Sequence, residues 1–173
     1  NSSHYKRGRE SMELYELIAP CHFGLEAVMK REILDLGYEI ERVEDGKVMF
    51  LADAEGIAYA NLFLRTTERI LLKVGQVHAE TYDELFEATK ALPWEKFIPK
   101  NGKFWVTKAN SIKSKLFSPS DIQSIMKKAI VERLKQVYHM EWFPEDGAQY
   151  PIRVSILKDE VTIGLDTSGV SLH

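Results

Sequence analysis

Residues 39–51, EIERVEDGKVMFL, decide how the first half of the chain is interpreted. Two stretches with the composition of strands, Glu39–Val43 and Lys47–Leu51, flank the dipeptide Asp45–Gly46. Asp-Gly favours a two-residue hairpin turn of type I′, because that turn needs positive φ at both central residues. We therefore expect an antiparallel β-hairpin at this point in the chain.

A strand and a helix are expected on each side of this hairpin. Before it, Glu13–Ala19 alternates polar and apolar residues as a strand does, and Phe23–Leu36 places apolar residues at helical spacing ahead of Gly37. After it, Ala54–Leu64 has a helical pattern and Ile70–Val77 is an apolar run typical of a strand. The order strand, helix, strand, strand, helix, strand is that of the ferredoxin-like split βαβ unit.

Helices and strands of a second unit follow. Thr81 and Glu84 are three residues apart at the start of an amphipathic stretch, the pattern of a helix with a capping box. Ser118, Pro119 and Asp121 indicate the start of a long helix. The pattern predicts an α+β fold in which this unit has a short helical turn, a strand, the long helix and two further strands, at Pro93–Ile98, Lys103–Ala109, Pro119–His139, Ile152–Leu157 and Val161–Leu165.

Composition and the chain ends set further bounds. With 45% apolar and 28% charged residues, the 173-residue chain is ordinary for a globular protein. The longest uncharged apolar stretch, Ile57–Leu64, is too short for a membrane helix, and the single Cys21 forbids an intrachain disulfide. No secretory signal is visible, so we expect a cytoplasmic protein. Residues 1–11 are polar and basic, and we interpret them as a flexible arm or a remnant of expression ahead of Met12.

Several catalytic motifs are excluded by the sequence. No two of the ten glycines are closer than five residues, which rules out a dinucleotide-binding GxGxxG loop and a Walker A loop. The five histidines are scattered, without HExxH, and the single cysteine precludes CxxC. A GxSxG nucleophile elbow is also absent from the sequence. We therefore predict no catalytic or metal site in this chain.

Positive charge is concentrated in one part of the chain. The formal net charge is −3, which by itself argues against a nucleic-acid-binding protein. Residues 103–135, however, contain eight Lys or Arg and two acids, so this segment carries +6 and the rest of the chain −9. Such an asymmetry is typical of a surface that binds a polyanion.

The loop that leads into the long helix has the chemistry of a phosphate-binding surface. Lys113 and Lys115 alternate with serines in residues 110–118, NSIKSKLFS, and a helix N-terminus attracts phosphate oxygens. On a helical wheel Lys128 and Lys135 lie opposite the apolar side. The candidate contact residues are Lys108, Lys113, Ser114, Lys115, Ser118, Lys127, Lys128 and Lys135.

The same residues also have a simpler interpretation. Lysines on one face of an amphipathic helix are commonly only a solvated surface, and Ser118 and Asp121 are explained by helix capping. Arg133 falls on the apolar side of the helix, where a side chain that snorkels to solvent or a structural ion pair is expected rather than a contact with RNA. The aromatic residues near these loops are interpreted as packing residues rather than base-stacking platforms; they are Trp94, Phe104, Trp105, Phe117, Trp142 and Phe143.

Longer motifs resemble a known family, the bacterial THUMP-containing RNA methyltransferases, whose members are also described as N6-adenine-specific DNA methylases. The resemblance covers the chain from Met12 onward. Its most specific elements are the KSKLFS loop with the helix that follows, and the ending DTSGVSLH. The stretches that carry it are ELIAPCHFGLEAVMKREILDLGY (16–38), ANLFLRTTERILLKVG (60–75), TYDELFEATKALPWEKFIP (81–99), SIKSKLFSPSDIQSIMKKAIVERL (111–134) and LDTSGVSLH (165–173).

This resemblance implies a ferredoxin-like domain at residues 12–79 and a THUMP domain at 80–168, which together bind structured RNA. In the family a C-terminal Rossmann-like domain carries S-adenosylmethionine and an Asn/Asp-Pro-Pro-Tyr motif. This chain holds neither, since its six prolines are never adjacent, and residues 169–173 would begin the linker to that catalytic domain. The resemblance therefore implies a non-enzymatic RNA-binding module without a cofactor of its own. Its RNA would be ribosomal, or alternatively transfer RNA, and the parent reaction guanine N2 methylation.

Two other classes of function stay open at this point. Ferredoxin-like modules host many unrelated functions, so a regulatory or small-molecule-binding protein without an RNA role is one alternative. The other is a small enzyme that transfers phosphate or hydrolyses an acyl phosphate, with Arg65 or Arg69 binding the anion.

Overall fold

The computed structural model describes residues 14–64 and 69–167, apart from the side chain of Lys108. The predicted arm at residues 1–11, the predicted linker at 169–173 and Arg65 lie outside the described residues. The chain divides into two compact units, and the division falls between Leu72 and Lys73, within β4 (Leu71–His78). No helix in the described part of the chain is long and apolar enough to span a membrane.

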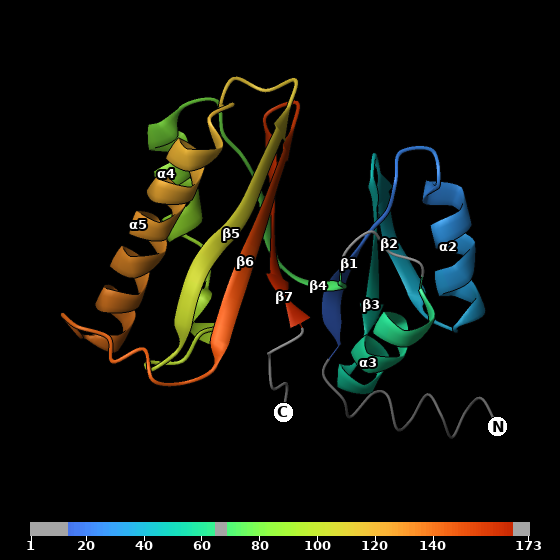
Figure 1. Ribbon diagram of the computed structural model, residues 1–173, viewed down its shortest axis with the longest axis horizontal. Helices are drawn as coiled ribbons and strands as arrows, with labels where there is room; N and C mark the ends of the chain where they lie inside the picture. Colours follow the sequence, from blue (N-terminus) through green and yellow to red (C-terminus); the bar gives the residue numbers. More distant parts are fainter. Residues whose placement is uncertain (1–13, 65–68, 168–173) are drawn as a thin grey trace. The chain divides into compact units, whose positions relative to one another are not determined.

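The first unit has the predicted ferredoxin-like order of elements (Figure 1). Its strands are arranged β2-β3-β1-β4, and both β3 and the start of β4 pair antiparallel with β1. Buried residues of β1 and β3, such as Leu17, Ile18, Met49 and Phe50, form the sheet's contribution to the core. The elements are β1 (Tyr15–Pro20), α2 (Glu26–Asp35), β2 (Glu39–Glu44), β3 (Lys47–Ala52) and α3 (Ala54–Phe63).

The predicted hairpin is confirmed, but its turn is of another type. Glu44 pairs with Lys47 across the two-residue turn, as expected. Of the two central residues, only Gly46 has a positive φ, at 79°, so type I′ was wrong here. The Gly46 N–H donates instead to the Glu26 carboxylate at 2.8 Å, which holds the turn in its observed shape. Positive φ at both central residues occurs in the other unit, at Lys158 (50°) and Asp159 (66°).

The second unit packs two helices together against one face of its strands (Figure 1). Strand β5 runs parallel to β6, and β6 is antiparallel to β7. Apolar residues of α5, among them Ile122, Met126 and Ile130, are fully buried beneath the helix. The elements are α4 (Tyr82–Lys90), η1 (Trp94–Lys96), β5 (Lys103–Ile112), α5 (Pro119–Tyr138), β6 (Gln149–Leu157) and β7 (Glu160–Asp166).

Local contacts explain where the helices of this unit begin and how they are held. The capping box at Thr81 and Glu84 is confirmed, with the Glu84 N–H donating to Thr81 Oγ1 at 3.1 Å. Of the two roles expected for Arg133 the structure has the ion pair, since its guanidinium binds the Glu95 carboxylate through two hydrogen bonds of 2.9 and 3.0 Å. Trp94 is fully buried and donates its indole N–H to the Thr89 carbonyl at 2.7 Å.

The packing role predicted for the loop aromatics is only partly correct. Trp94 and Phe104 are buried, as expected, and Trp105 and Phe143 are half-buried. Phe117 and Trp142, however, are 76% and 73% exposed. Both lie in connecting segments, where the neighbouring residues Leu116 and Phe143 are the more buried members of each pair. Aromatic character alone does not show which of two adjacent loop residues turns inward.

Candidate nucleic-acid interface

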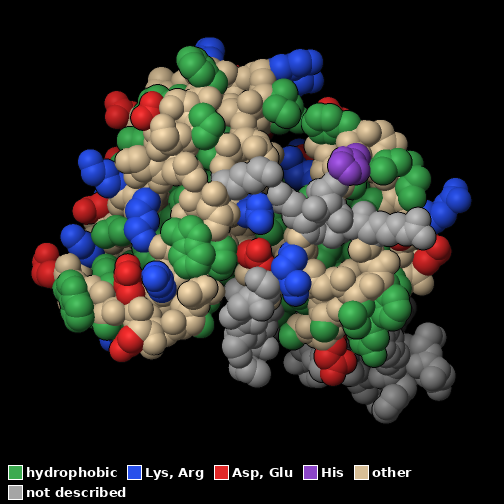
Figure 2. All heavy atoms as spheres, viewed as in Figure 1, with side chains coloured by type: hydrophobic (Ala, Val, Ile, Leu, Met, Phe, Trp, Pro, Cys, Tyr) green, Lys and Arg blue, Asp and Glu red, His purple; other side chains and the backbone are tan. Residues whose placement is uncertain are grey.

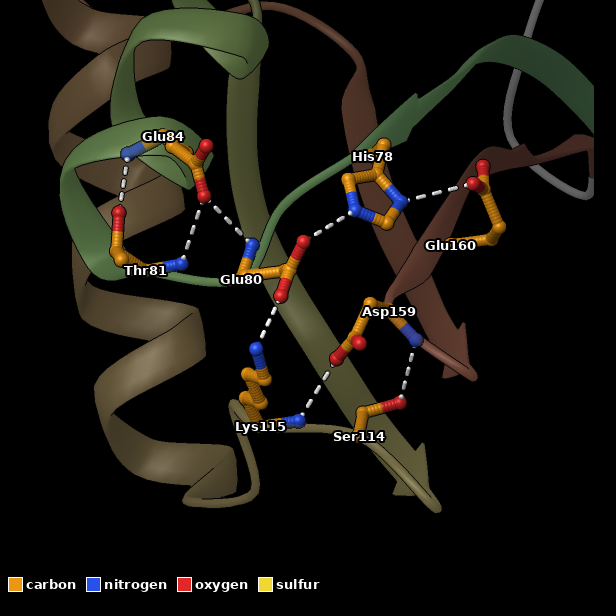
Figure 3. A network of polar contacts seen from close by, with 8 residues as sticks. All are labelled: His78, Glu80, Thr81, Glu84, Ser114, Lys115, Asp159 and Glu160. Carbon is orange, nitrogen blue, oxygen red and sulfur yellow. Dashed lines mark hydrogen bonds and ion pairs between the residues drawn. The ribbon is translucent and has the colours of Figure 1, made fainter.

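The loop of residues 113–118, between β5 and α5, is attached to the turn between β6 and β7 (Figure 3). Oδ1 of Asp159 accepts a hydrogen bond of 2.8 Å from the Lys115 backbone N–H, and the Asp159 N–H donates to Ser114 Oγ at 3.0 Å. The Ser114 hydroxyl donates in turn to the Ile112 carbonyl at 2.9 Å. These bonds hold the loop backbone at Ser114 and Lys115 in one arrangement.

A series of charged side chains extends from this loop to the end of β4 (Figure 3). Lys115 forms an ion pair with Glu80 through its ammonium group. The other carboxylate oxygen of Glu80 lies 2.9 Å from His78 Nε2, and His78 Nδ1 lies 2.9 Å from Glu160 Oε1. The charge of Lys115 is therefore already matched by a carboxylate, and the imidazole lies between two carboxylates.

These contacts shift the pKa values of the groups that make them. The hydrogen bond to Glu80, followed by the one to Glu160, raises the pKa of His78 above its ordinary value of 6.5. Hydrogen bonds from His78 and Lys115 lower the pKa of Glu80 to about 2. Glu80 raises the pKa of Lys115 in return. Because the side chains of His78, Glu80 and Lys115 are 38% to 66% exposed, solvent screens these interactions and they add little to stability.

Lys113 and Phe117 lie on the solvent-exposed side of the same loop. Lys113 is exposed, and its backbone adopts the left-handed conformation with φ of 50°. Among the described residues, no carboxylate is paired with the Lys113 ammonium. Phe117 is 76% exposed and is followed directly by Ser118 and α5. The loop thus presents one unmatched positive charge and one open aromatic ring to solvent.

The side chain of Lys127 makes its contacts within the fold. Its ammonium donates to the Phe104 carbonyl at 2.6 Å and lies 3.7 Å from the centre of the Phe104 ring. Burial lowers the pKa of Lys127 below its usual range. Since Phe104 is only 3% exposed, this contact joins α5 to β5 and orients the lysine away from the outer helix face.

The remaining predicted lysines are spread along the second unit. Lys128 is exposed on α5 and Lys135 is half-buried in its last turn. The two are seven positions apart, which corresponds to about 10 Å along the helix, and about 24 Å separates Pro119 from Lys135. The backbone of Lys108 is part of β5, and its side chain lies outside the described residues. The candidates therefore extend from the loop of residues 113–118 along α5 and do not form one compact patch.

Ser118 occupies the N-cap position of α5 but does not cap it with its side chain. The structure gives its hydroxyl no hydrogen bond to a helix N–H, contrary to the expectation from the sequence. The hydroxyl lies instead 3.4 Å from Ser120 Oγ. The first turn of α5 consequently relies on Pro119 at its start, which has no N–H to satisfy.

Four residues of this site were not singled out from the sequence as site residues, namely His78, Glu80, Asp159 and Glu160. Glu80 and Lys115 are 35 positions apart, and His78 and Glu160 are 82 apart. No local spacing connects such residues, because the sheet brings them together. Only Asp159 and Glu160 had a signal, since they lie between the two strands expected at Ile152–Leu157 and Val161–Leu165.

Family models match both units of the chain. Residues 16–71 match the RlmL ferredoxin-like domain, and residues 79–166 match the THUMP domain. The chain belongs to the THUMP family. The loop of residues 113–118 and, apart from His78, the charged network therefore lie in a THUMP domain, and the unit with α2 and α3 is a ferredoxin-like domain.

Relatives with high identity are named as a methyltransferase or a methylase. The "Putative RNA methyltransferase YpsC" of Bacillus subtilis strain 168 is 51% identical over 164 residues, which are 94% of this chain and 42% of the relative. A solved "possible methylase" from Clostridium difficile 630 has a TM-score of 0.84 and 49% identity, covering 89% of this chain and 41% of that one. The chain thus spans less than half the length of these relatives.

More distant relatives are named for two kinds of RNA. The tRNA (guanine(6)-N2)-methyltransferase of Archaeoglobus fulgidus is 25% identical over 95% of this chain and 42% of its own length. The ribosomal RNA large subunit methyltransferase K/L of Dichelobacter nodosus is 26% identical over 92% of this chain and 22% of its own length. A solved structure named "SMU.472, a putative methyltransferase complexed with SAH" has 40% identity and a TM-score of 0.80 over 89% of this chain and 41% of that one.

Proposed function

We propose that this chain is the RNA-binding part of a longer S-adenosylmethionine-dependent RNA methyltransferase. Its RNA is structured, ribosomal RNA being favoured over transfer RNA, and the parent reaction is methylation of guanine N2. The membership of the THUMP family supports the proposal, together with relatives named for RNA methylation. We place the ferredoxin-like domain at residues 12–79 and the THUMP domain at 80–168, in a protein of the cytoplasm.

The candidate residues would have different roles in RNA binding. Lys113 carries an exposed positive charge on a backbone that Ser114, Lys115 and Asp159 hold in place, so it is suited to contact a phosphate of folded RNA. The observation that carries this assignment is the absence of a described carboxylate partner for Lys113. Lys128 and Lys135, along α5, would contact further phosphates, and the Ser118 hydroxyl is free of helix capping.

The other predicted contact residues would act mainly by shaping this surface. The side chains of Ser114 and Lys115 are used in bonds to Ile112 and Glu80, and Lys127 is used against Phe104. A phosphate could reach Lys115 only in competition with Glu80. We therefore propose that Lys115 and Lys127 position the RNA-binding surface and that Lys113 contacts an RNA phosphate directly.

The described residues of this chain offer no glycine-rich loop for S-adenosylmethionine. No two of its glycines are closer than five residues, whereas a loop that cradles a nucleotide-like cofactor has closely spaced glycines. Beside two glycines of the second unit, a neighbouring side chain already fills the space next to the backbone. A Cβ added at Gly75 would lie 2.6 Å from Leu92, and one at Gly102 would lie 2.9 Å from Tyr150. We therefore assign the cofactor and the methyl transfer to a C-terminal catalytic domain of the parent protein, and the described residues of this chain also offer no cluster for a metal ion.

Fluorescence anisotropy of a labelled, folded ribosomal RNA fragment tests the proposal. The chain is expected to bind, and its affinity should fall with salt with a log–log slope of about −3 to −5, corresponding to about four to six phosphate contacts. Lys113→Glu should weaken binding, whereas Lys96→Glu, which makes the same charge change at an exposed lysine of the same domain outside the basic segment, should have little effect.

Two results would overturn parts of this proposal. Failure to bind any folded RNA at low salt, by a chain shown to be folded, would contradict an RNA-binding function of this part on its own. Equal losses from Lys113→Glu and Lys96→Glu would show that binding responds to net charge only, and the assignment of Lys113 would be wrong. A transfer RNA measured beside the ribosomal fragment decides between the two RNA classes.

A further inference from the structure

The outward face of α3 is apolar and open to solvent. Tyr59, Leu62 and Phe63 are 53%, 76% and 60% exposed, and the rings of Tyr59 and Phe63 stack with their centres 6.2 Å apart. Glu55, in the first turn, is the one charged residue within residues 54–63. In the space-filling view, hydrophobic side chains gather over the position of α3 (Figure 2). We call Tyr59, Leu62 and Phe63 the α3 face.

The helix α2 of the same domain shows what a solvated helix looks like here. It also exposes apolar residues, with Val28 and Leu34 at 53% and 50%. Exposed Lys30, Arg31 and Asp35 lie among them, as is usual on a surface helix. The inner side of α3 is apolar too, since Gly56, Ile57 and Ala60 are buried. A helix that is apolar on both sides is typically covered on both sides.

The size of the α3 face limits what could cover it. Its three side chains expose on the order of 400 Å², which is the size of patch that often marks an interaction site. A stable dimer needs about 800 Å² from each partner, so these residues alone do not make one. A domain tethered in the same polypeptide needs a smaller buried area to stay docked, because the tether supplies a high effective concentration. RNA is disfavoured, since residues 54–63 contain no Lys or Arg to meet its phosphates.

We propose that the α3 face is the docking surface for a domain of the same polypeptide outside these 173 residues, namely the catalytic domain. The proposal rests on the proposed function for the existence of that domain. The relatives leave room for it, because the matched segment is 42% of the Bacillus subtilis protein and 41% of the Clostridium difficile chain. The docked domain would present an apolar surface, and Tyr59, Leu62 and Phe63 would be buried when it is in place.

Cysteine labelling in the full-length parent protein tests this inference. Leu62→Cys is made both in the 173-residue chain and in the longer polypeptide, and its rate of reaction with a maleimide is measured. The matched control is Val28→Cys on α2, which is also more than half exposed, and the unsubstituted proteins report the buried Cys21. Ala58→Cys, an exposed position on the same side of α3, repeats the test with a smaller change of side chain.

Labelling at Leu62→Cys and Ala58→Cys is expected to be about tenfold slower in the longer polypeptide, with the rate at Val28→Cys unchanged. Equal rates in both proteins would overturn the inference, as would slowing at all three positions. Protection within the short chain that grows with protein concentration, or that appears on adding RNA, would assign the face to a second copy or to RNA instead. RNA binding is measured separately, so protection of Leu62→Cys without RNA binding would contradict the proposed function and leave the docking surface standing.

Discussion

The loop of residues 113–118 has an anchored side and an open side, which the sequence does not distinguish. Lys113 and Lys115 are the same residue type in the same serine-rich loop, and they were predicted to have the same role. In the structure Lys115 is bound through its backbone to Asp159 and through its ammonium to Glu80, whereas Lys113 faces solvent. Leu116 and Phe117 differ in the same way, at 4% and 76% exposed. The partners of a lysine, rather than its position in a basic segment, decide whether it is free to meet a phosphate.

The largest expected effect is the difference in the free energy of unfolding between alanine substitutions at Leu116 and at Phe117. Leu116→Ala removes a buried side chain beneath the loop and should lower the free energy of unfolding by about 2–4 kcal/mol. Phe117→Ala removes a larger side chain that is mostly in water, and should change it by less than about 0.5 kcal/mol. Urea denaturation of the two variants measures both values. Similar losses at the two positions would show that the loop has no distinct sides.

A smaller loss of stability is expected from substitutions at Asp159, which attaches the loop to the β6–β7 turn. Asp159→Ala removes the acceptor for the Lys115 N–H and places alanine at a φ of 66°, so it should cost about 1–2 kcal/mol. Asp159→Asn keeps an oxygen at the same position and should cost less. Hydrogen exchange at the Lys115 amide should speed up in the alanine variant and much less in the asparagine variant. Unchanged exchange in both would contradict the role of Asp159 as the anchor.

The smallest effect concerns pH. Because the pKa of His78 is raised in the folded state, its bonds to Glu80 and Glu160 contribute fully below about pH 6.5 and are lost as the pH rises through the folded-state value. The free energy of unfolding should therefore decline slightly as the pH rises above that range, and the decline should be smaller in Glu80→Gln. An NMR titration should give His78 a pKa above 6.5 that falls in Glu80→Gln and stays unchanged in Glu87→Gln, an exposed control. A pKa at or below 6.5 in the unsubstituted protein would contradict the network.

The elements of the fold were predictable because their signals are local. Strand alternation, helical spacing, the capping box at Thr81 and the turn residue Gly37 all operate within a few positions, and the observed elements follow them. The turn type at Asp45–Gly46 was not predictable, because it depends on Glu26, which lies 20 residues away from Gly46. The exposure of Phe117 and Trp142 also depends on how each loop is seated on the sheet.

The basic residues of the candidate site were visible in the sequence, but their partners in the fold were not. The basic segment drew attention to the part of the THUMP domain that holds the loop of residues 113–118, and the ion pair of Arg133 is one of the two roles expected from its place on the apolar side of α5. The roles of Lys115 and Lys127 depended on Glu80 and Phe104, which are 35 and 23 residues away from them. A long-range carboxylate partner leaves no mark in the spacing of the sequence.

The most direct test compares two single variants of the loop, Lys113→Gln and Lys115→Gln, which change the net charge equally. RNA affinity is measured for each at several salt concentrations, with the unsubstituted chain alongside. Lys113→Gln is expected to weaken binding a few-fold and to reduce the magnitude of the salt slope by about one, while Lys115→Gln leaves the slope unchanged. A reduced slope for Lys115→Gln with none for Lys113→Gln, or equal reductions for both, would contradict the division of the loop into an anchored and an open side.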